Sequence, residues 1–502
     1  MPTLNRAPNE KELETLVSIY LRAETAIINE IGRLRSQGLV DYHAVAALER
    51  VQAILRQMES DCWEYVPKMI EKQFYVRVPE ARKALEVPET AAKHAAGYAN
   101  AAVLTGEQHA IVDRLAANLM GEITDASMTV MATLQSALIG RVEPDVYRRV
   151  GLEQVAAQQA AGRGVNASVP AFVQTLRREG VRAFTDKAGR DWSLHTYCTM
   201  VSRTTSRQAE VLAVLTADSE HDLYMISSHG TTCALCAPYE GRVYSRSGTD
   251  PDFPPLAAAF GKVDPAGPDT LANTWLNIHP NCLHVLLPWT AAGRTDEEIQ
   301  KIKDFSNPRK NPFSRDPRSE SQIAAYRKKE RARAQWLADY RQWERYRVTL
   351  GNRVPGRFET FLHQKREDGE RYRLWRLDYR RRAGLLEHPE RALPGADKAS
   401  AADAKFTGYF FNPENPKGLA KGRAFSSHLG YNVENWQIMR DEILEAAKMY
   451  PVTYRSSSIY GKLYSQLVIL QGVNNKPANV LLGWVVKPDG STWLTTAHME
   501  EF

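Results

Sequence analysis

The sequence is poor in cysteine and has no long apolar run. Five cysteines in 502 residues are too few for a disulfide framework, which favours a reducing compartment. The longest apolar stretches, such as residues 480–482 followed by 484–486, are far shorter than the ~20 residues of a membrane span. The opening MPTLNRAPNEKELETLV contains no apolar core of signal-peptide length. We therefore expect a soluble protein, intracellular or packaged from inside a cell, without membrane association.

Charge is unevenly distributed along the chain. The formal net charge is +6, but residues 301–382 hold 24 Lys and Arg against 11 Asp and Glu, a balance of +13 that leaves −7 for the rest. This asymmetry indicates one segment that meets a polyanion rather than a uniformly basic protein. The length also exceeds what one hydrophobic core can serve and predicts roughly three or four domains.

The first part of the chain has the pattern of a helical bundle. Apolar residues recur at intervals of three and four along residues 13–34 and again along 45–58, which predicts two amphipathic helices. Thr105 and Gln108 fit a capping box ahead of a further apolar stripe. No catalytic constellation accompanies these helices, so we expect residues 1–183 to form a structural helical domain.

From Phe184 the pattern changes to mixed α and β. The stretch FTDKAGRDWSL predicts a β-hairpin, residues 196–215 predict a helix, and residues 223–226 predict a short strand. This strand delivers the chain to a segment, 227–289, that gathers three of the five cysteines and several histidines.

Cysteine and histidine are concentrated at the two ends of that segment. Cys233 and Cys236 are spaced C-x-x-C, and His279, Cys282 and His284 form H-P-N-C-x-H. Both sets supply the ligand types of a tetrahedral zinc site, and we predict a closed structural zinc site with the three cysteines and one of the two histidines. A reduced cluster without metal is the alternative, because the 42 residues between the half-sites exceed the spacing of a zinc finger.

A catalytic interpretation of this cluster is weaker. Zinc deaminases carry H-x-E ahead of P-C-x-x-C, whereas here Thr231 and Thr232 precede the C-x-x-C and no H-x-E comes before it. A Cys/His nucleophilic pair would lack a third group to orient it. We therefore expect the cluster to be a clasp that holds a loop.

Beyond Trp289 the chain becomes strongly charged. Residues 292–319 contain several helix breakers and predict an exposed connection. Residues 323–350 and 353–382 predict helices in which basic groups interleave with aromatic ones, a mixture that can grip a phosphate backbone and stack on bases. Alternatively, the aromatics pack a helical hairpin and the charges only solvate it. The cations expected to contact DNA are Arg327, Lys328, Lys329, Arg331, Arg333, Arg341, Arg345, Arg347, Arg380, Arg381 and Arg382.

The end of the chain predicts a separate α+β domain. The segment HPERALPGADKASAADAK is small, polar and rich in turn residues, which is typical of a linker. Two helices and then strands at 464–470, 478–486 and 492–496 are expected beyond it, separated by Gly/Pro/Asn-rich turns.

Three stretches in the centre resemble a known family. VSRTTSRQAE, DLYMISSHGTTCALCAPYEGRVYS and HPNCLHVLLPW look like the phage minor capsid protein 2 family, a relative of MuF-like head morphogenesis proteins. The resemblance implies a structural, non-enzymatic virion protein of a tailed phage that passes through the host cytoplasm during assembly. Multiple copies around the portal vertex, contact with the portal protein and other head proteins, and a role in head assembly or genome delivery are also implied. The basic segment independently fits a neighbour of packaged double-stranded DNA, bound without sequence preference.

The expected fold is therefore multidomain α+β. Its parts are a helical N-terminal domain (1–183), a MuF-like α/β centre with the zinc clasp (184–290), a basic aromatic helical arm (291–386), a linker (387–404) and a small α+β C-terminal domain (405–502).

The C-terminal domain raises an alternative function. KFTGYFFNPENPKGLAKGRAFSSHLGY through VLLGWVVKPDGSTWLTTAH resembles a domain of unknown function of the DUF6883 type. Domains at this position in MuF-like proteins are sometimes toxins, so the alternative is a phage-delivered effector with a nuclease-type C-terminal domain. The residues that a metal-independent ribonuclease could use there are Lys421, His428, Tyr464, Thr495 and His498. We expect a structural or binding role instead, because His428 adjoins Leu429 on a predicted helix and can simply pack or cap it.

Overall fold

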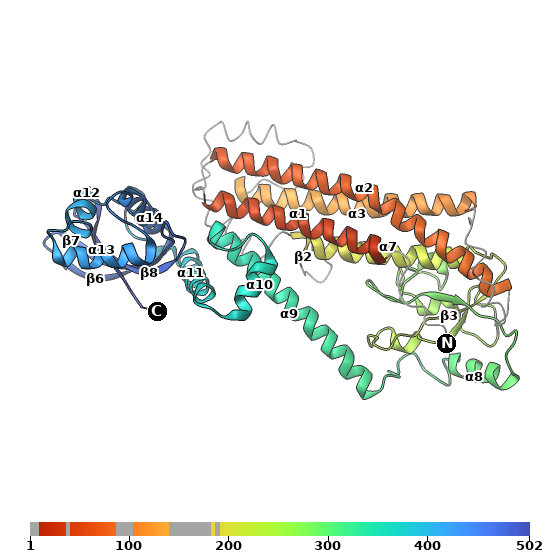
Figure 1. Ribbon diagram of the computed structural model, residues 1–502. Coiled ribbons are helices and arrows are strands. Elements are labelled where there is room, and N and C mark those ends of the chain that lie inside the picture. The colour runs from red at the N-terminus through yellow and green to blue at the C-terminus, as the bar shows by residue number, and fades with distance from the viewer. Residues whose placement is uncertain (1–9, 37–40, 87–103, 140–181, 186–190, 502) are drawn as a thin grey trace. The chain divides into compact units, whose positions relative to one another are not determined.

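The computed structural model of the protein describes residues 10–36, 41–86, 104–139, 182–185 and 191–501 (Figure 1). These residues form a multidomain chain of helices with three small antiparallel sheets. Within this part of the chain, no helix has the length and apolarity that crossing a membrane requires. The chain divides into two compact units: Met1–Ala26, Glu49–Leu134 and Val181–Ala338 form the first, and Ile27–Leu48, Gln135–Gly180 and Asp339–Phe502 form the second.

Long helices packed side by side supply much of the first unit (Figure 1). They are α1 (Glu10–Ser36), α2 (Asp41–Glu86), α3 (Gly106–Ile139) and α7 (Leu194–Leu215), although the end of α1, the start of α2 and the end of α3 belong to the second unit. Helix α7 contacts α1 through Tyr20 and Ser202, whose hydroxyl oxygens lie 2.8 Å apart. It contacts α3 where the Tyr197 hydroxyl donates to Glu122 at 2.5 Å. The predicted helices are confirmed among the described residues, although residues 140–181 of the predicted domain lie outside them. Helix α7, which follows the predicted boundary at residue 183, packs against these helices.

Local signals explain where these helices lie. Most of the apolar stripe residues predicted on α1 and α2 are buried, with Tyr20 and Leu55 at 0% and 2% exposure. The capping box is confirmed, because Gln108 N donates to Thr105 Oγ1 at 3.2 Å and Thr105 N donates to Gln108 Oε1 at 2.9 Å. The backbone N–H groups of Thr105 and Gln108, which lack partners within the helix, are therefore hydrogen-bonded.

The predicted hairpin before α7 is confirmed. Strands β1 (Arg182–Thr185) and β2 (Asp191–Ser193) pair antiparallel, whereas the turn residues 186–190 lie outside the described residues. A second sheet follows α7, with β3 (Leu223–Ile226) between β4 (Val243–Ser245) and β5 (Leu286–Pro288). Ile226, the last residue of β3, pairs with Leu286, the first residue of β5. The residues that follow β3 and the residues that precede β5 therefore start from neighbouring positions. This register brings the two cysteine half-sites together.

Helix α8 (Asp296–Ser306) occupies part of the segment predicted as an exposed connection. It begins with a capping box in which the Thr295 side chain accepts from Glu298 N and the Glu298 side chain accepts from Thr295 N. The T-x-x-E start signal was therefore present in the sequence, and the neighbouring breakers obscured it. The prediction was wrong for this helix.

The second unit combines three helices of the basic segment with an α+β domain. The helices are α9 (Glu320–Leu350, whose first part belongs to the first unit), α10 (Phe358–Glu367) and α11 (Glu370–Glu387). The domain contains α12 (Asp403–Lys405), the π-helical turn η9 (Phe406–Phe410), α13 (Pro416–Leu429), α14 (Trp436–Met449), β6 (Val452–Ser458), β7 (Gly461–Leu470), β8 (Ala478–Val486) and β9 (Thr492–Met499). Its sheet has the order β6-β7-β8-β9. The sequence predicted all of these strands except β6, which is a polar edge strand.

Aromatic residues of the arm pack inside it. Trp343 and Phe361 are fully buried, and the Phe361 and Trp375 rings stack with centroids 5.9 Å apart. The Tyr346 and Tyr379 rings stack at 4.4 Å. These aromatics therefore build a helical hairpin, as the alternative interpretation of the sequence proposed, and are not available to stack on bases.

The segment predicted as a linker packs against the C-terminal domain instead. Leu393 is 2% exposed and belongs to that domain's core. Ser400 N donates to Thr492 O and Leu494 N donates to Ser400 O, each at 2.9 Å. The segment thus pairs with the first residues of β9 through Ser400 and satisfies backbone groups that an open sheet edge would leave unpaired. Its small polar residues indicated a linker. Composition alone could not show that Ser400 pairs with β9, because that pairing depends on a strand about 90 residues further along the chain.

Candidate metal centre

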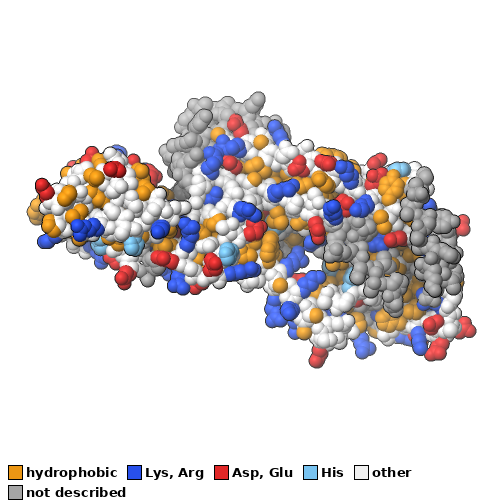
Figure 2. Space-filling model, in the orientation of Figure 1, with side chains coloured by type: hydrophobic (Ala, Val, Ile, Leu, Met, Phe, Trp, Pro, Cys, Tyr) orange, Lys and Arg blue, Asp and Glu red, His pale blue; other side chains and the backbone are white. Residues whose placement is uncertain are grey.

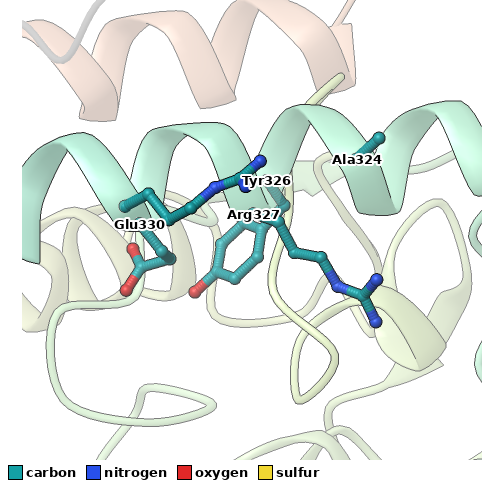
Figure 3. A pocket seen from close by; sticks show the side chains of 5 residues that line it. Ala324, Tyr326, Arg327 and Glu330 are labelled. Atoms are coloured by element: carbon teal, nitrogen blue, oxygen red, sulfur yellow. The ribbon is translucent and has the colours of Figure 1, made fainter.

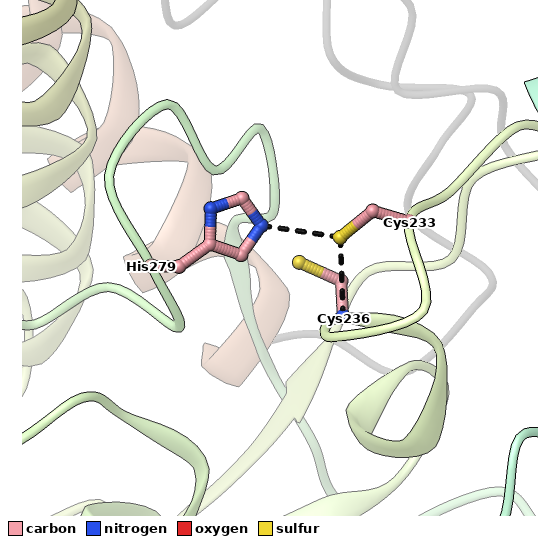
Figure 4. Close-up of side chains that lie close together, drawn as sticks. All are labelled: Cys233, Cys236 and His279. Carbon is pink, nitrogen blue, oxygen red and sulfur yellow. Dashed lines mark hydrogen bonds between the residues drawn. The ribbon is translucent and has the colours of Figure 1, made fainter. Parts of the chain in front are cut away.

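The first half-site follows directly from β3. Ala237 N donates to Cys233 O at 3.1 Å and Cys236 N donates to Cys233 Sγ at 3.4 Å (Figure 4). The chain therefore turns tightly around the Cys233 sulfur, which sets both thiols of the C-x-x-C on one side of the turn. This is the local geometry that two cysteine ligands of a single ion require.

The second half-site is a β-turn with a left-handed residue. Cys282 N donates to His279 O at 3.0 Å, which closes a four-residue turn with Pro280 and Asn281 at its centre. Asn281 has φ +64°, the conformation that the third residue of a type II turn adopts, and proline suits the second position. The turn holds His279 and Cys282 at its two ends.

All five predicted ligands meet in one cluster. Cys233 Sγ lies 3.2 Å from His279 Nε2, and Cys236 Sγ lies 3.8 Å from Cys282 Sγ. Cys282 Sγ lies 3.3 Å from His284 Nδ1. The donors form two overlapping groups of three that share Cys236, and within each group the ligand atoms lie within 4.8 Å of one another. Figure 4 shows one group, Cys233, Cys236 and His279, converging from two separate loops.

Each histidine is oriented by its other ring nitrogen. His279 Nδ1 lies 2.6 Å from Pro280 O, which leaves Nε2 facing the sulfur of Cys233. His284 Nε2 lies 2.5 Å from Glu240 Oε1, which leaves Nδ1 facing Cys282. Ligating histidines usually have such partners, because these fix the ring and its tautomer. Glu240 was missed from the sequence, although it lies in the family-like stretch APYEGRVYS.

The cluster favours deprotonated thiols. Hydrogen bonds in which Cys236 is the donor lower the pKa of Cys233 to about 3 and the pKa of Cys282 to about 4. Those same two contacts and burial raise the pKa of Cys236. Burial lowers the pKa of His284, but its hydrogen bonds to Cys282 and Glu240 outweigh this and raise it to about 9. These shifts favour the thiolate, the form that binds metal, at Cys233 and Cys282.

A further histidine, His229, packs against the cluster. The His229 ring meets the His284 ring edge to face with centroids 4.5 Å apart, and His229 Nε2 lies 3.2 Å from Ser227 Oγ. Burial lowers the pKa of His229. The S-S-H stretch of the family-like pattern therefore packs beside the ligands.

The family-like stretch VSRTTSRQAE on α7 packs into the bundle rather than forming a site. Arg207 is 7% exposed and pairs with Glu210 one turn later. Glu210 is 1% exposed and also receives Arg77 of α2, with Arg77 Nη2 to Glu210 Oε1 at 3.0 Å. A buried carboxylate between two guanidinium groups is well compensated.

The cations predicted to contact DNA fall into two classes. Exposed ones are Arg327, Lys328, Lys329, Arg331, Arg333, Arg341, Arg345 and Arg380. Figure 2 shows Lys and Arg side chains at the surface. In contrast, Arg347 and Arg382 are 7% and 4% exposed, and Arg381 is partly buried and donates to Asn479 at 2.7 Å. Burial and fixed protein partners correct the prediction for these three residues, since none presents an open guanidinium to a phosphate.

Most of the exposed cations lie on the first half of α9. A hollow on this helix is lined by Ala324, Tyr326, Arg327, Glu330 and Arg331 (Figure 3). Nearly every residue of α9 before Asp339 is exposed or partly exposed. This half of α9 therefore presents its cations to solvent.

The nuclease-type residues of the alternative function are distributed over the C-terminal domain. Tyr464 pairs with Trp484, and His498 pairs with Leu481. Side chains alternate along a strand, so positions 481 and 484 of β8 face opposite sides of the sheet. Tyr464 and His498 consequently lie on opposite faces.

The remaining residues of that set lie around β9 and α13. Lys421 Nζ donates to Thr496 Oγ1 at 3.0 Å, and the Thr495 carbonyl accepts from Lys405. His428 is exposed in the last turn of α13. The structure brings the lysines to the edge of the sheet.

These features define a multidomain, largely helical protein whose centre is built around a cysteine–histidine cluster. The chain belongs to the phage minor capsid protein 2 family, whose model matches residues 7–346. Residues 392–501 match a second family model, described as a domain of unknown function (DUF6883). Neither a curated protein nor a solved structure matches the chain.

Both resemblances drawn from the sequence are confirmed by these matches. The protein is a structural component of a phage head, with the virion as its location and other head proteins as its partners. The second match begins inside the segment predicted as a linker, in agreement with the packing of Leu393 in the C-terminal core.

Proposed function

We propose that this protein is a zinc-stabilised minor head protein that associates with the portal vertex and contacts packaged DNA. The single observation that supports it best is the convergence of Cys233, Cys236, Cys282 and two oriented histidines in a chain of this family. The proposed domains follow the sequence, 1–183, 184–290 and 291–386, with the C-terminal domain extended back over most of the segment 387–404.

The donor set fits zinc. Three cysteines and one of His279 or His284 would complete a tetrahedral site of the structural kind. The sulfur–sulfur separation of 3.8 Å matches two cysteine ligands of a tetrahedral zinc ion, and the sulfur–nitrogen separations of 3.2 and 3.3 Å are slightly shorter than those of bound ligands. Cys236 and Cys282 are 2% and 3% exposed. Bound zinc would supply cross-linking of the two half-sites and hold the loop between Tyr244 and His279.

Elemental analysis of the purified, reduced full-length protein tests this assignment. We expect about one zinc ion per chain, as for other closed structural sites, and loss of that zinc in Cys236→Ser. Cys62→Ala is the matched control, since Cys62 is buried in the bundle helix α2 and its replacement should leave zinc bound. Protein that carries no stoichiometric metal, or zinc that survives Cys236→Ser, would contradict the proposal.

DNA contact is assigned to the exposed cations of α9. Arg327, Lys328, Lys329, Arg331 and Arg333 lie within seven consecutive residues that include one acid, Glu330. Their side chains are exposed, and Lys and Arg that neutralise phosphates release counterions and bind DNA irrespective of sequence. A neighbour of the packaged genome at the portal would benefit from such a surface during packaging or delivery.

Binding of duplex DNA to the full-length protein at several salt concentrations tests this assignment. Lys328→Gln, Lys329→Gln and Arg331→Gln together should weaken binding and lower the slope of log affinity against log salt by about 0.9 for each phosphate that the variant no longer neutralises. The matched control neutralises three exposed cations of the bundle, Lys68, Lys83 and Arg114. Equally weakened binding in both variants, or binding insensitive to salt, would refute the assignment to α9.

A further inference from the structure

We propose that the C-terminal domain carries a phosphate-binding site at the edge of β9, formed by Lys405, Lys421 and Thr496. This site goes beyond the proposed function, because it involves neither the metal centre nor the exposed half of α9. It lies in the domain to which no activity is assigned.

Two ammonium groups meet at one place on the sheet edge. Lys421, on α13, donates from Nζ to Thr496 Oγ1 at 3.0 Å. Lys405, at the end of α12, donates to the backbone carbonyl of Thr495, the adjacent residue. Because the groups they bind are neighbours on β9, the two amines lie at the same point of the strand.

Neither amine is neutralised within the described residues. The acids that lie nearby in sequence are engaged elsewhere, since Asp403 pairs with Arg440 at 2.9 Å and Glu500 pairs with His498 at 3.0 Å. Burial and the charge of Lys421 lower the pKa of Lys405, as expected where like charges face one another without a counter-ion. An ammonium has three donors, and each lysine here uses one of them on a threonine.

The backbone of β9 is shaped around this point. Gly483 pairs with Thr496 and Trp484 with Leu494, so Thr495 is the extra residue of a β-bulge. A Cβ on Gly483 would lie 2.8 Å from both Thr495 Oγ1 and Thr496 Cγ2. Glycine therefore leaves room for two threonine side chains beside the lysines, and bulges are frequent where strands re-aim side chains at functional sites.

The chemistry selects a phosphate group as the ligand. Two positive charges with four unused N–H donors match a dianion with several acceptor oxygens, and lysine binds phosphate as a point charge. The phosphate could belong to inorganic phosphate or to the backbone of a nucleic acid, so the test includes both.

Lysine footprinting of the full-length protein tests the site residue by residue. The protein is acylated briefly and the modification of each lysine is measured by mass spectrometry, with inorganic phosphate, duplex DNA, acetate or chloride at equal ionic strength. We expect phosphate to slow modification of Lys405 and Lys421 by about tenfold near saturation, since occupancy follows mass action. Exposed Lys417, on the same helix as Lys421, should be unaffected and serves as the internal control.

Variants and the DNA arm complete the design. Lys421→Gln should abolish protection of Lys405, whereas Lys417→Gln should preserve it. Protection by inorganic phosphate alone assigns a small phosphate ligand, and protection of both lysines by DNA that disappears in Lys421→Gln assigns the nucleic acid backbone. Absence of protection by either probe, or equal protection by acetate, overturns the proposal.

Discussion

Single residues shape the candidate metal centre through the backbone as well as through their side chains. Asn281 occupies the left-handed region at φ +64°, where glycine is unstrained and residues with a Cβ are not. Asparagine tolerates this region better than other side-chain-bearing residues. The proline and asparagine of H-P-N-C were therefore readable in the sequence as a turn, whereas their role in orienting His279 became apparent only from the ring contacts.

Replacing Asn281 separates backbone strain from side-chain chemistry. Asn281→Ala should weaken zinc binding by roughly tenfold, because a left-handed alanine costs about 1–2 kcal/mol. Asn281→Gly should retain near-normal affinity. Competition with a chromophoric chelator measures both. A glycine variant as weak as the alanine variant would show that the asparagine side chain, rather than its φ angle, matters.

Glu240 acts on the centre through His284. Its carboxylate accepts from His284 Nε2, and removal of such outer partners typically costs about 10–100-fold in metal affinity. We therefore expect Glu240→Gln to weaken zinc binding within that range. Glu220→Gln is the control, because Glu220 is exposed and lies outside the cluster. Unchanged affinity in Glu240→Gln would assign His284 a packing role and leave His279 as the histidine ligand.

At the scale of elements, glycines allow α13 to lie against η9. A Cβ on Gly422 would lie 1.8 Å from Phe410 O, and one on Gly418 would lie 2.0 Å from Tyr409 O. These carbonyls belong to backbone that cannot move aside cheaply. The spacing G-x-x-x-G in the sequence KGLAKG was visible, but the π-helical turn that it contacts was not, since π-helices have no distinct sequence pattern.

Gly422→Ala should destabilise the C-terminal domain. Overpacking of this kind costs about 1–3 kcal/mol, so the urea midpoint of the transition that reports on this domain should fall. Gly384→Ala on α11 provides the matched control, because its Cβ meets nothing within 4 Å and alanine raises helix propensity by about 1 kcal/mol. Similar behaviour of the two variants would contradict the close helix approach.

A buried ionic network joins α11 to the same domain. Asp378 Oδ1 accepts from Arg382 Nε at 2.8 Å and from the Tyr450 hydroxyl at 2.6 Å, and Arg382 Nη2 donates to Tyr450 at 2.9 Å. Arg353 reaches Asp378 Oδ2 at 3.3 Å. Two of the arginines in the basic arm are thus structural, which is why the local charge of +13 overstates the charge available to a partner.

Replacing Asp378 by a neutral residue would leave the charge of Arg382 buried without its counter-ion. Asp378→Asn should lower the free energy of unfolding of the second unit by about 3–5 kcal/mol, because Arg382 would remain buried without its counter-ion. Asp397→Asn, at an exposed position, should change it by much less. Urea unfolding monitored by tryptophan fluorescence distinguishes them. A small decrease in Asp378→Asn would mean that water or the Tyr450 hydroxyl compensates the arginine.

At the scale of the whole molecule, helices and strands were predicted better than the contacts between them. Periodic helices, the hairpin and the buried strands β7, β8 and β9 followed from local patterns. The polar edge strand β6, the edge-covering segment 392–404 and the inward-facing arginines did not, because each depends on a neighbour distant in sequence. The five residues of the candidate metal centre could be singled out because three of the five cysteines fall in two short motifs with histidines beside them.

Removing the proposed zinc tests whether the cluster stabilises only the loop between its two half-sites. Because the two half-sites bracket the loop 237–278, chelation should raise hydrogen exchange across 227–289 and leave α13 and α14 protected. Structural zinc contributes folding free energy where it cross-links such segments. Exchange measured by mass spectrometry, with and without chelator, locates the change. A uniform increase along the chain would indicate global unfolding rather than release of a clasp.

The two edges of the C-terminal sheet are unequal, and this limits how copies of the domain can associate. Ser400 already occupies the β9 edge, whereas β6 is largely exposed and ends beside Ile459 and Tyr460, at 90% and 71% exposure. A sheet with one free edge can extend through one neighbour only. Pairing of two copies through β6 would therefore close as a two-fold dimer rather than propagate into a fibre.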